Sequence, residues 1–119
     1  FPTRRSSDLE KFGKYLARDL GGQKLTTSQI RNVFGEVKRI QLKGGLEIEE
    51  NKTPFLLLKP KLAYAAEKEN KKGPREFRKV MDKALSQIDI DSEDANKQFQ
   101  NFVDFLEAVL AYHKAAEGR

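Results

Sequence analysis

His113 is the only histidine in this chain of 119 residues, and the chain contains no cysteine. A zinc site would therefore need carboxylates in unusual number, and any nucleophile–base pair that uses an imidazole would have to use His113. We interpret His113 as a helix histidine with satisfied hydrogen bonds near the end of a bundle. The sequence predicts no catalytic residue, no metal ligand and no cofactor, and therefore no enzyme.

The acidic run at residues 89–94 resembles a calcium-binding loop in composition. Its sixth position is Asp94, where such a loop needs glycine, and its twelfth is Gln100, where it needs glutamate. We interpret these acids as groups that stabilise the N-terminus of the following helix. Two Gly-Gly pairs occur, but neither belongs to a GxxxxGK or GxGxxG pattern, so a phosphate-binding loop is not supported.

The distribution of charge is more informative than these motifs. The formal net charge is +5. Residues 59–83 hold nine Lys and Arg against four Asp and Glu, whereas residues 86–119 hold three against seven. A basic middle followed by an acidic last third suits a polyanion on one face and a protein neighbour on another. For any single charge, a solvated helix face remains the simpler explanation.

Basic residues at helical spacing are the candidates for contact with nucleic acid. If the second and third predicted helices lie side by side, one ridge would carry Arg31, Lys38, Arg39, Lys59 and Lys61. Such a ridge would contact phosphates and read little sequence. The aromatic side chains that could stack on a single strand are Tyr64, Tyr112 and His113.

Apolar periodicity predicts an all-α fold, a single five-helix antiparallel bundle. The expected helices cover residues 9–20, 25–43, 55–66, a segment opened by Gly73-Pro74, and 99–114. The last of these is apolar around most of its circumference, so we expect it at the centre of the bundle. Pro60 should kink or restart the third helix, because proline cannot donate a backbone hydrogen bond.

The second helix carries the clearest end signals. Thr26 and Gln29 form a capping-box pattern at its start, and Gly44-Gly45 follows its end. Gly35 inside this helix costs about 1 kcal/mol relative to alanine and needs a reason. We favour close packing of another helix at Gly35 over the alternative, the approach of a ligand backbone between Arg31 and Lys38.

Residues 1–9 read like the translation of a short-read sequencing adapter that runs into a truncated gene. We therefore expect residues 1–9 to be foreign and disordered, residues 10–119 to form the helical-bundle domain, and the native N-terminus to be missing. No apolar run approaches the roughly 20 residues of a membrane span, and the absence of cysteine fits a reducing compartment. We expect a cytoplasmic protein with no membrane contact.

Three segments together resemble one family. They are LTTSQIR from Leu25 followed by Val33-Phe34, LLLKPKLAYA from Leu56, and FVDFLEAVLAYHK from Phe102. In this order they resemble the small helical subunit of type III-A CRISPR Csm effector complexes. The resemblance covers nearly all of the chain from Leu9 onward.

The resemblance implies an all-α protein without catalytic activity of its own. Several copies would stack along the ribonucleoprotein, and its partners would be the target RNA and guide RNA backbone, other Csm subunits and copies of itself. Basic positions of the family fall on Arg31, Lys59, Lys61 and Lys114. Lys38 and Arg39 are added from helical geometry, and Tyr64 from its position one turn after Lys61.

Two other functions stay open at this point. One is a helical protein–protein adaptor without direct contact to nucleic acid, whose basic ridge meets an acidic partner. The other is a bundle that binds DNA without sequence preference. Charge reversals at Arg31 and Lys59 would separate an RNA-binding subunit from an adaptor, because only the first loses RNA while assembly stays intact.

Overall fold

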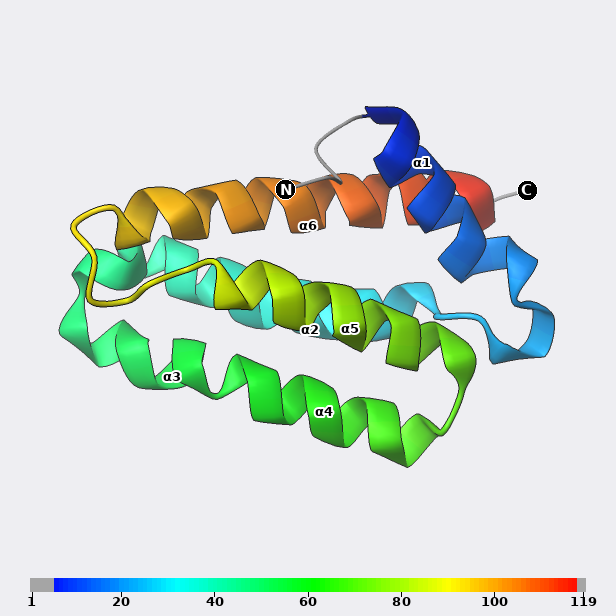
Figure 1. The fold of residues 1–119 in the computed structure, drawn as a ribbon, viewed down its shortest axis with the longest axis horizontal. Helices are drawn as coiled ribbons and strands as arrows, with labels where there is room; N and C mark the ends of the chain where they lie inside the picture. Colours follow the sequence, from blue (N-terminus) through cyan, green and yellow to red (C-terminus); the bar gives the residue numbers. More distant parts are fainter. Residues whose placement is uncertain (1–5, 118–119) are drawn as a thin grey trace.

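Successive long helices run in alternating directions along the molecule in the computed structural model, which describes residues 6–117 (Figure 1). These helices are α2 (Thr27–Leu42), α4 (Leu58–Glu69), α5 (Lys72–Ser86) and α6 (Ala95–Glu117). A short helix, α3 (Lys52–Leu56), precedes α4, and α1 (Ser6–Lys14) packs against α6. No strand occurs within residues 6–117, so the predicted all-α fold is confirmed.

The ends of α2 follow from local signals, as predicted. The Thr26 hydroxyl accepts a hydrogen bond from the Gln29 N–H at 3.2 Å, and Gln29 Oε1 accepts one from the Thr26 N–H at 2.7 Å. This reciprocal capping box satisfies backbone donors that the first turn leaves free. At the other end, Gly44 adopts a left-handed φ of 106°, which a residue with a side chain rarely adopts.

The third predicted helix is broken, which confirms the expectation for Pro60. The α-helical pattern stops at Leu57 and resumes with α4, so α3 and α4 are two pieces of one interrupted helix. Pro60 has no N–H for the Leu56 carbonyl, and its ring would clash with that carbonyl in a regular helix. The break therefore lies three residues before the proline that causes it.

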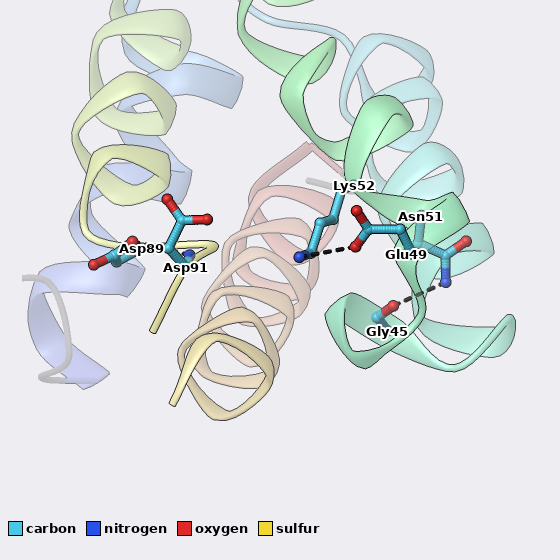
Figure 2. A network of polar contacts seen from close by, with 6 residues as sticks. All are labelled: Gly45, Glu49, Asn51, Lys52, Asp89 and Asp91. Atoms are coloured by element: carbon cyan, nitrogen blue, oxygen red, sulfur yellow. Dashed lines mark hydrogen bonds and ion pairs between the residues drawn. The ribbon is translucent and has the colours of Figure 1, made fainter. Parts of the chain in front are cut away.

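The connection between α2 and α3 consists of short, regular turns. It consists of the 3-10 turns η4 (Gly45–Glu47) and η5 (Glu49–Asn51). Asn51 is 5% exposed, and its Nδ2 donates to the Gly45 carbonyl at 2.8 Å and to the Lys43 carbonyl at 3.2 Å (Figure 2). One buried amide therefore satisfies the Lys43 carbonyl at the end of α2 and ties it to η4.

The core forms around α6, as its apolar circumference predicted. Phe99, Val103, Leu106 and Val109 are buried on this helix, and Phe99 meets Phe55 edge to face at 5.9 Å between ring centroids. α6 contacts α1, α2, η4 and the π-helical turn η2 (Tyr15–Asp19) that continues α1. None of the helices within residues 6–117 has the length and apolarity that crossing a bilayer requires.

The helix α1 begins earlier than the predicted domain boundary at residue 10. Ser6–Lys14 is helical, and Leu9 is 7% exposed within the core. Disorder was therefore the wrong expectation for residues 6–9, because Leu9 extends the apolar stripe of Phe12 and Leu16. Residues 1–5 lie outside the described part, and the foreign origin of residues 1–9 stays a prediction.

Candidate nucleic-acid interface

The outer side of α2 carries two of the predicted cations. Arg31 and Lys38 are seven residues apart, about two helical turns, and therefore lie on one side of α2. Arg31 is exposed, and the Lys38 ammonium lies 5.8 Å from the centroid of the Phe34 ring. This cation–π contact holds the partly buried Lys38 side chain along the helix.

Gly35 lies between these two cations and faces open space. A Cβ atom placed on Gly35 would meet no neighbouring heavy atom within 4 Å. The preferred explanation for this glycine, close packing of another helix, is therefore wrong within residues 6–117. The alternative still fits, since a ligand backbone could approach α2 between Arg31 and Lys38 without meeting a side chain.

A shared carboxylate joins Arg39 to Lys61 across the groove between α2 and α4. Glu36 lies 3.9 Å from the Arg39 guanidinium and 3.6 Å from the Lys61 ammonium. The side chains of Arg39 and Lys61 are 66% and 55% exposed. Exposed ion pairs contribute about 0–1 kcal/mol, so a phosphate can replace Glu36 at either cation with little loss of stability.

Tyr64 lies on the α4 side of the same groove. The groove has a volume of about 350 Å³, and its walls include Asn32 and Glu36 of α2 and Lys61 and Tyr64 of α4. Tyr64 is 70% exposed, so its ring is free to stack on a base. The other two predicted stacking residues do not share this position, because Tyr112 is half-buried in the core and His113 is 0% exposed.

Lys59 does not share a ridge with Lys61. The Lys59 ammonium donates a hydrogen bond to the Ser86 hydroxyl on α5 at 2.7 Å, whereas Lys61 pairs with Glu36 on α2. Residues two apart on a helix point in nearly opposite directions, so these lysines face different neighbours. The single ridge of five cations is therefore wrong. Arg31 and Lys38 share the outer side of α2, Arg39 and Lys61 share Glu36 at the groove, and Lys59 faces α5.

Lys114 is exposed near the C-terminal end of α6, away from this group. It follows His113, whose Nε2 lies 2.6 Å from the carbonyl oxygen of Leu25, just before α2. Lys114 therefore stands at the end of the bundle where α2 begins, rather than along the side of α2.

His113 is a structural residue, as predicted. Its Nε2–H donates to the Leu25 carbonyl, and its Nδ1 lies 3.5 Å from the Thr27 hydroxyl oxygen. The Thr27 hydroxyl donates to Glu117, which lowers the pKa of this carboxyl below its ordinary value of 4.5, with a smaller contribution from His113. The imidazole is sealed from solvent, so no substrate reaches it. Residues 6–117 contain no group of three or more His, Asp or Glu that could hold a metal.

The sequence interpretation missed two groups at this site. Glu36 is the acid that Arg39 and Lys61 share, and its spacing of three from Arg39 was the available signal. Lys68 also lines the groove between α2 and α4. It follows Lys61 by seven residues and so lies on the same side of α4, but it is embedded in a stretch of mixed charge that gives no clear pattern.

Comparison with known proteins adds one finding. The family model described as Csm2 Type III-A matches residues 3–119. No curated protein and no solved structure matches the chain.

Proposed function

This chain belongs to the Csm2 family of type III-A CRISPR systems, and we propose that it binds RNA as a non-catalytic subunit of the Csm complex. The family makes it a structural subunit of that effector complex, whose partners are other Csm subunits. Several copies stack along the complex, in the cytoplasm, and each presents a basic face to the backbone of the target RNA and of its duplex with the guide.

The observation that carries this proposal is the group of cations on α2 and α4. We call Arg31, Lys38, Arg39 and Lys61 the basic face. The open position at Gly35 lets a ribose–phosphate backbone approach α2 between the first two. Tyr64 adds an exposed ring beside Lys61, which suits an unpaired base or a ribose at the edge of the duplex.

The basic face is suited to phosphates rather than to base recognition. Lysine and arginine neutralise phosphates on any sequence, because they bind the phosphate charge and not the edges of the bases. In RNA-guided complexes, sequence is read by base pairing with the guide, so a subunit that grips the backbone serves every target equally.

The phosphate contacts predict a measurable dependence on salt. Each neutralised phosphate contributes roughly 0.7–0.9 to the slope of log K against log salt. Four cations therefore contribute a slope of about 3 for each bound copy when all four contact phosphates.

Charge reversal at Arg31 and Lys38 tests the proposal in a reconstituted Csm complex. Arg31→Glu with Lys38→Glu should leave the complex assembled and weaken its affinity for target RNA at least tenfold. Lys79→Glu on α5 is the matched control, since Lys79 is 70% exposed and lies outside the basic face. Loss of assembly with RNA affinity retained would support the adaptor function instead. Equal loss of affinity for duplex DNA and for target RNA would support a nonspecific DNA-binding bundle.

A further inference from the structure

The groove between α2 and α4 has an apolar floor. The floor is formed by side chains from three helices, among them Val33 of α2, Leu62 of α4 and Phe77 of α5. Leu62 and Phe77 are buried, and Val33 is half-buried. A phosphate would lose its water on such a surface without gaining a polar partner. The floor therefore favours an uncharged group with an apolar face.

The size and the rim of the groove suit one nucleobase. Its volume of about 350 Å³ lies within the range of roughly 300–1,000 Å³ that holds small ligands. A base has two apolar faces and a polar edge, so it can bury a face on the floor and keep its edge at the rim. The exposed Asn32 amide stands at this rim on α2. An amide offers both donors and an acceptor, so it can bond to the edge of any base.

Tyr64 supplies an aromatic partner on the α4 side of the groove. Its ring lines the groove and is largely exposed, so a base that enters can reach it. Among the large apolar side chains exposed within residues 6–117, Tyr64 is the one aromatic side chain. Stacking on a base would remove this ring from water. The groove is therefore where this surface is best suited to hold a base.

Two lysines flank Tyr64 on the same side of α4. Lys61 precedes Tyr64 by three residues and Lys68 follows it by four, and these spacings place all three on one face of the helix. All three line the groove. A nucleoside within a strand has a phosphate on each side, whereas a free mononucleotide has only one. Two cations on either side of one ring therefore favour a nucleotide within a strand.

The acids of the groove keep phosphates at its rim. Glu36 and Glu69 line the groove together with the two lysines. Their carboxylates repel a phosphate that would enter the groove but do not repel an uncharged base. The charges thus favour a strand that puts its base inside and leaves its phosphates outside, next to Lys61 and Lys68.

We propose that this groove binds one unstacked base of the RNA strand, with the base on the Tyr64 ring and the flanking phosphates on Lys61 and Lys68. The inference rests on the proposed function, because it needs the strand that the basic face holds. Every base has a face that can stack on an aromatic ring, so this site accepts any sequence. It requires the bound nucleotide to leave the regular stack of the strand.

Two RNA oligomers of equal length separate the contribution of the base from that of the phosphates. One is oligouridylate, whose bases stack weakly on one another, and the other carries the same ribose phosphates without bases. The full chain should bind oligouridylate at least about fivefold more tightly than the abasic oligomer, the lower end of what stacking on an aromatic side chain contributes. Fluorescence anisotropy of labelled oligomers measures the ratio of the two affinities.

Tyr64→Ala and Ala65→Phe should each lower this ratio to about one. The first removes the ring, and the second fills the groove from an exposed position at its rim. Tyr64→Phe should keep the ratio, because the ring stacks without its hydroxyl group. Ala111→Phe is the matched control, since Ala111 is exposed on α6 and lies outside the groove. Thermal unfolding by circular dichroism checks that every variant is folded.

The inference is overturned if the wild type binds both oligomers equally or binds neither, or if Tyr64→Ala and Ala65→Phe keep its ratio. Uridine monophosphate that competes as strongly as oligouridylate would assign the groove to a free nucleotide instead. Loss of complex assembly by Ala65→Phe with the ratio retained would assign it to a neighbouring protein. Arg31→Glu with Lys38→Glu should weaken the binding of both oligomers alike. If it changes neither affinity, the proposed phosphate contacts fail, while the ratio still tests the groove.

Discussion

Glu36 of α2 lies 3.6 Å from the Lys61 ammonium of α4 and thereby bridges the groove between the two helices. The same carboxylate reaches Arg39, so one acid partly neutralises two of the four cations of the basic face. A phosphate that binds Arg39 or Lys61 has to compete with Glu36. We therefore predict that Glu36 lowers the affinity of the basic face for phosphates.

Glu36→Gln should strengthen the binding of target RNA by the complex, by roughly 3–10-fold, because it removes a competing negative charge. The free energy of unfolding should change by about 1 kcal/mol or less, as expected for exposed ion pairs. Filter binding and urea unfolding measure the two quantities. Glu76→Gln is the matched control, because Glu76 pairs with Lys79 three residues later on α5. Weaker RNA binding by Glu36→Gln would contradict a phosphate-binding role.

Gly35→Ala should raise the stability of the fold while lowering the affinity for RNA. Alanine should stabilise α2 by up to about 1 kcal/mol, since the new methyl group meets no neighbour. The same methyl group narrows the approach between Arg31 and Lys38, so the affinity for RNA should fall several-fold. Thermal unfolding and RNA titration check both. An alanine variant that is more stable and binds RNA as tightly as the wild type would show that no backbone approaches Gly35.

His113→Gln should destabilise the fold by about 1–3 kcal/mol, because the buried Leu25 carbonyl loses a well-placed donor. Urea unfolding measures this change. RNA affinity at a temperature where the variant is folded should stay close to wild type, since His113 is sealed within the bundle. A selective loss of RNA binding or of any activity with full stability would contradict the structural role.

The Thr27–Glu117 hydrogen bond should make stability depend on pH. It lowers the pKa of Glu117 in the folded chain, so its stabilisation is present above the ordinary value of 4.5 and is lost as the pH falls through the lower folded value. As the pH falls from about 5 to about 3, the unfolding free energy of Glu117→Gln should therefore decrease less than that of the wild type. Glu107→Gln, on the exposed side of the same helix, is the control. An identical pH profile for wild type and Glu117→Gln would refute the effect.

Elements with strong local signals were predictable from the sequence. α2 begins at the capping box of Thr26 and ends just before the left-handed Gly44, as the sequence predicted. Pro60 correctly predicted the break before α4, and the apolar residues of α6 correctly predicted that this helix lies at the centre of the core. In each case the residues that determine the structure lie close together in the sequence, so the local sequence pattern is enough to predict it.

The arrangement of the cations was less predictable, because it depends on how helices face one another. Lys59 and Lys61 are close in sequence but point to α5 and α2, and their orientation depends on the break at Leu57. The crossing of α1 and α6 is equally non-local, since a Cβ atom on Gly13 would lie 2.7 Å from the Cβ atom of Tyr112.

Contact between the basic face and phosphates is tested most directly by the dependence of target RNA affinity on salt. Reconstituted complexes with wild-type chain, Arg31→Ala, Lys38→Ala and the control Lys79→Ala should be compared over a range of salt concentrations. Each of the first two substitutions should reduce the slope of log K against log salt by roughly 1 per bound copy, while Lys79→Ala leaves it unchanged. Slopes that are the same for all four complexes would contradict this contact.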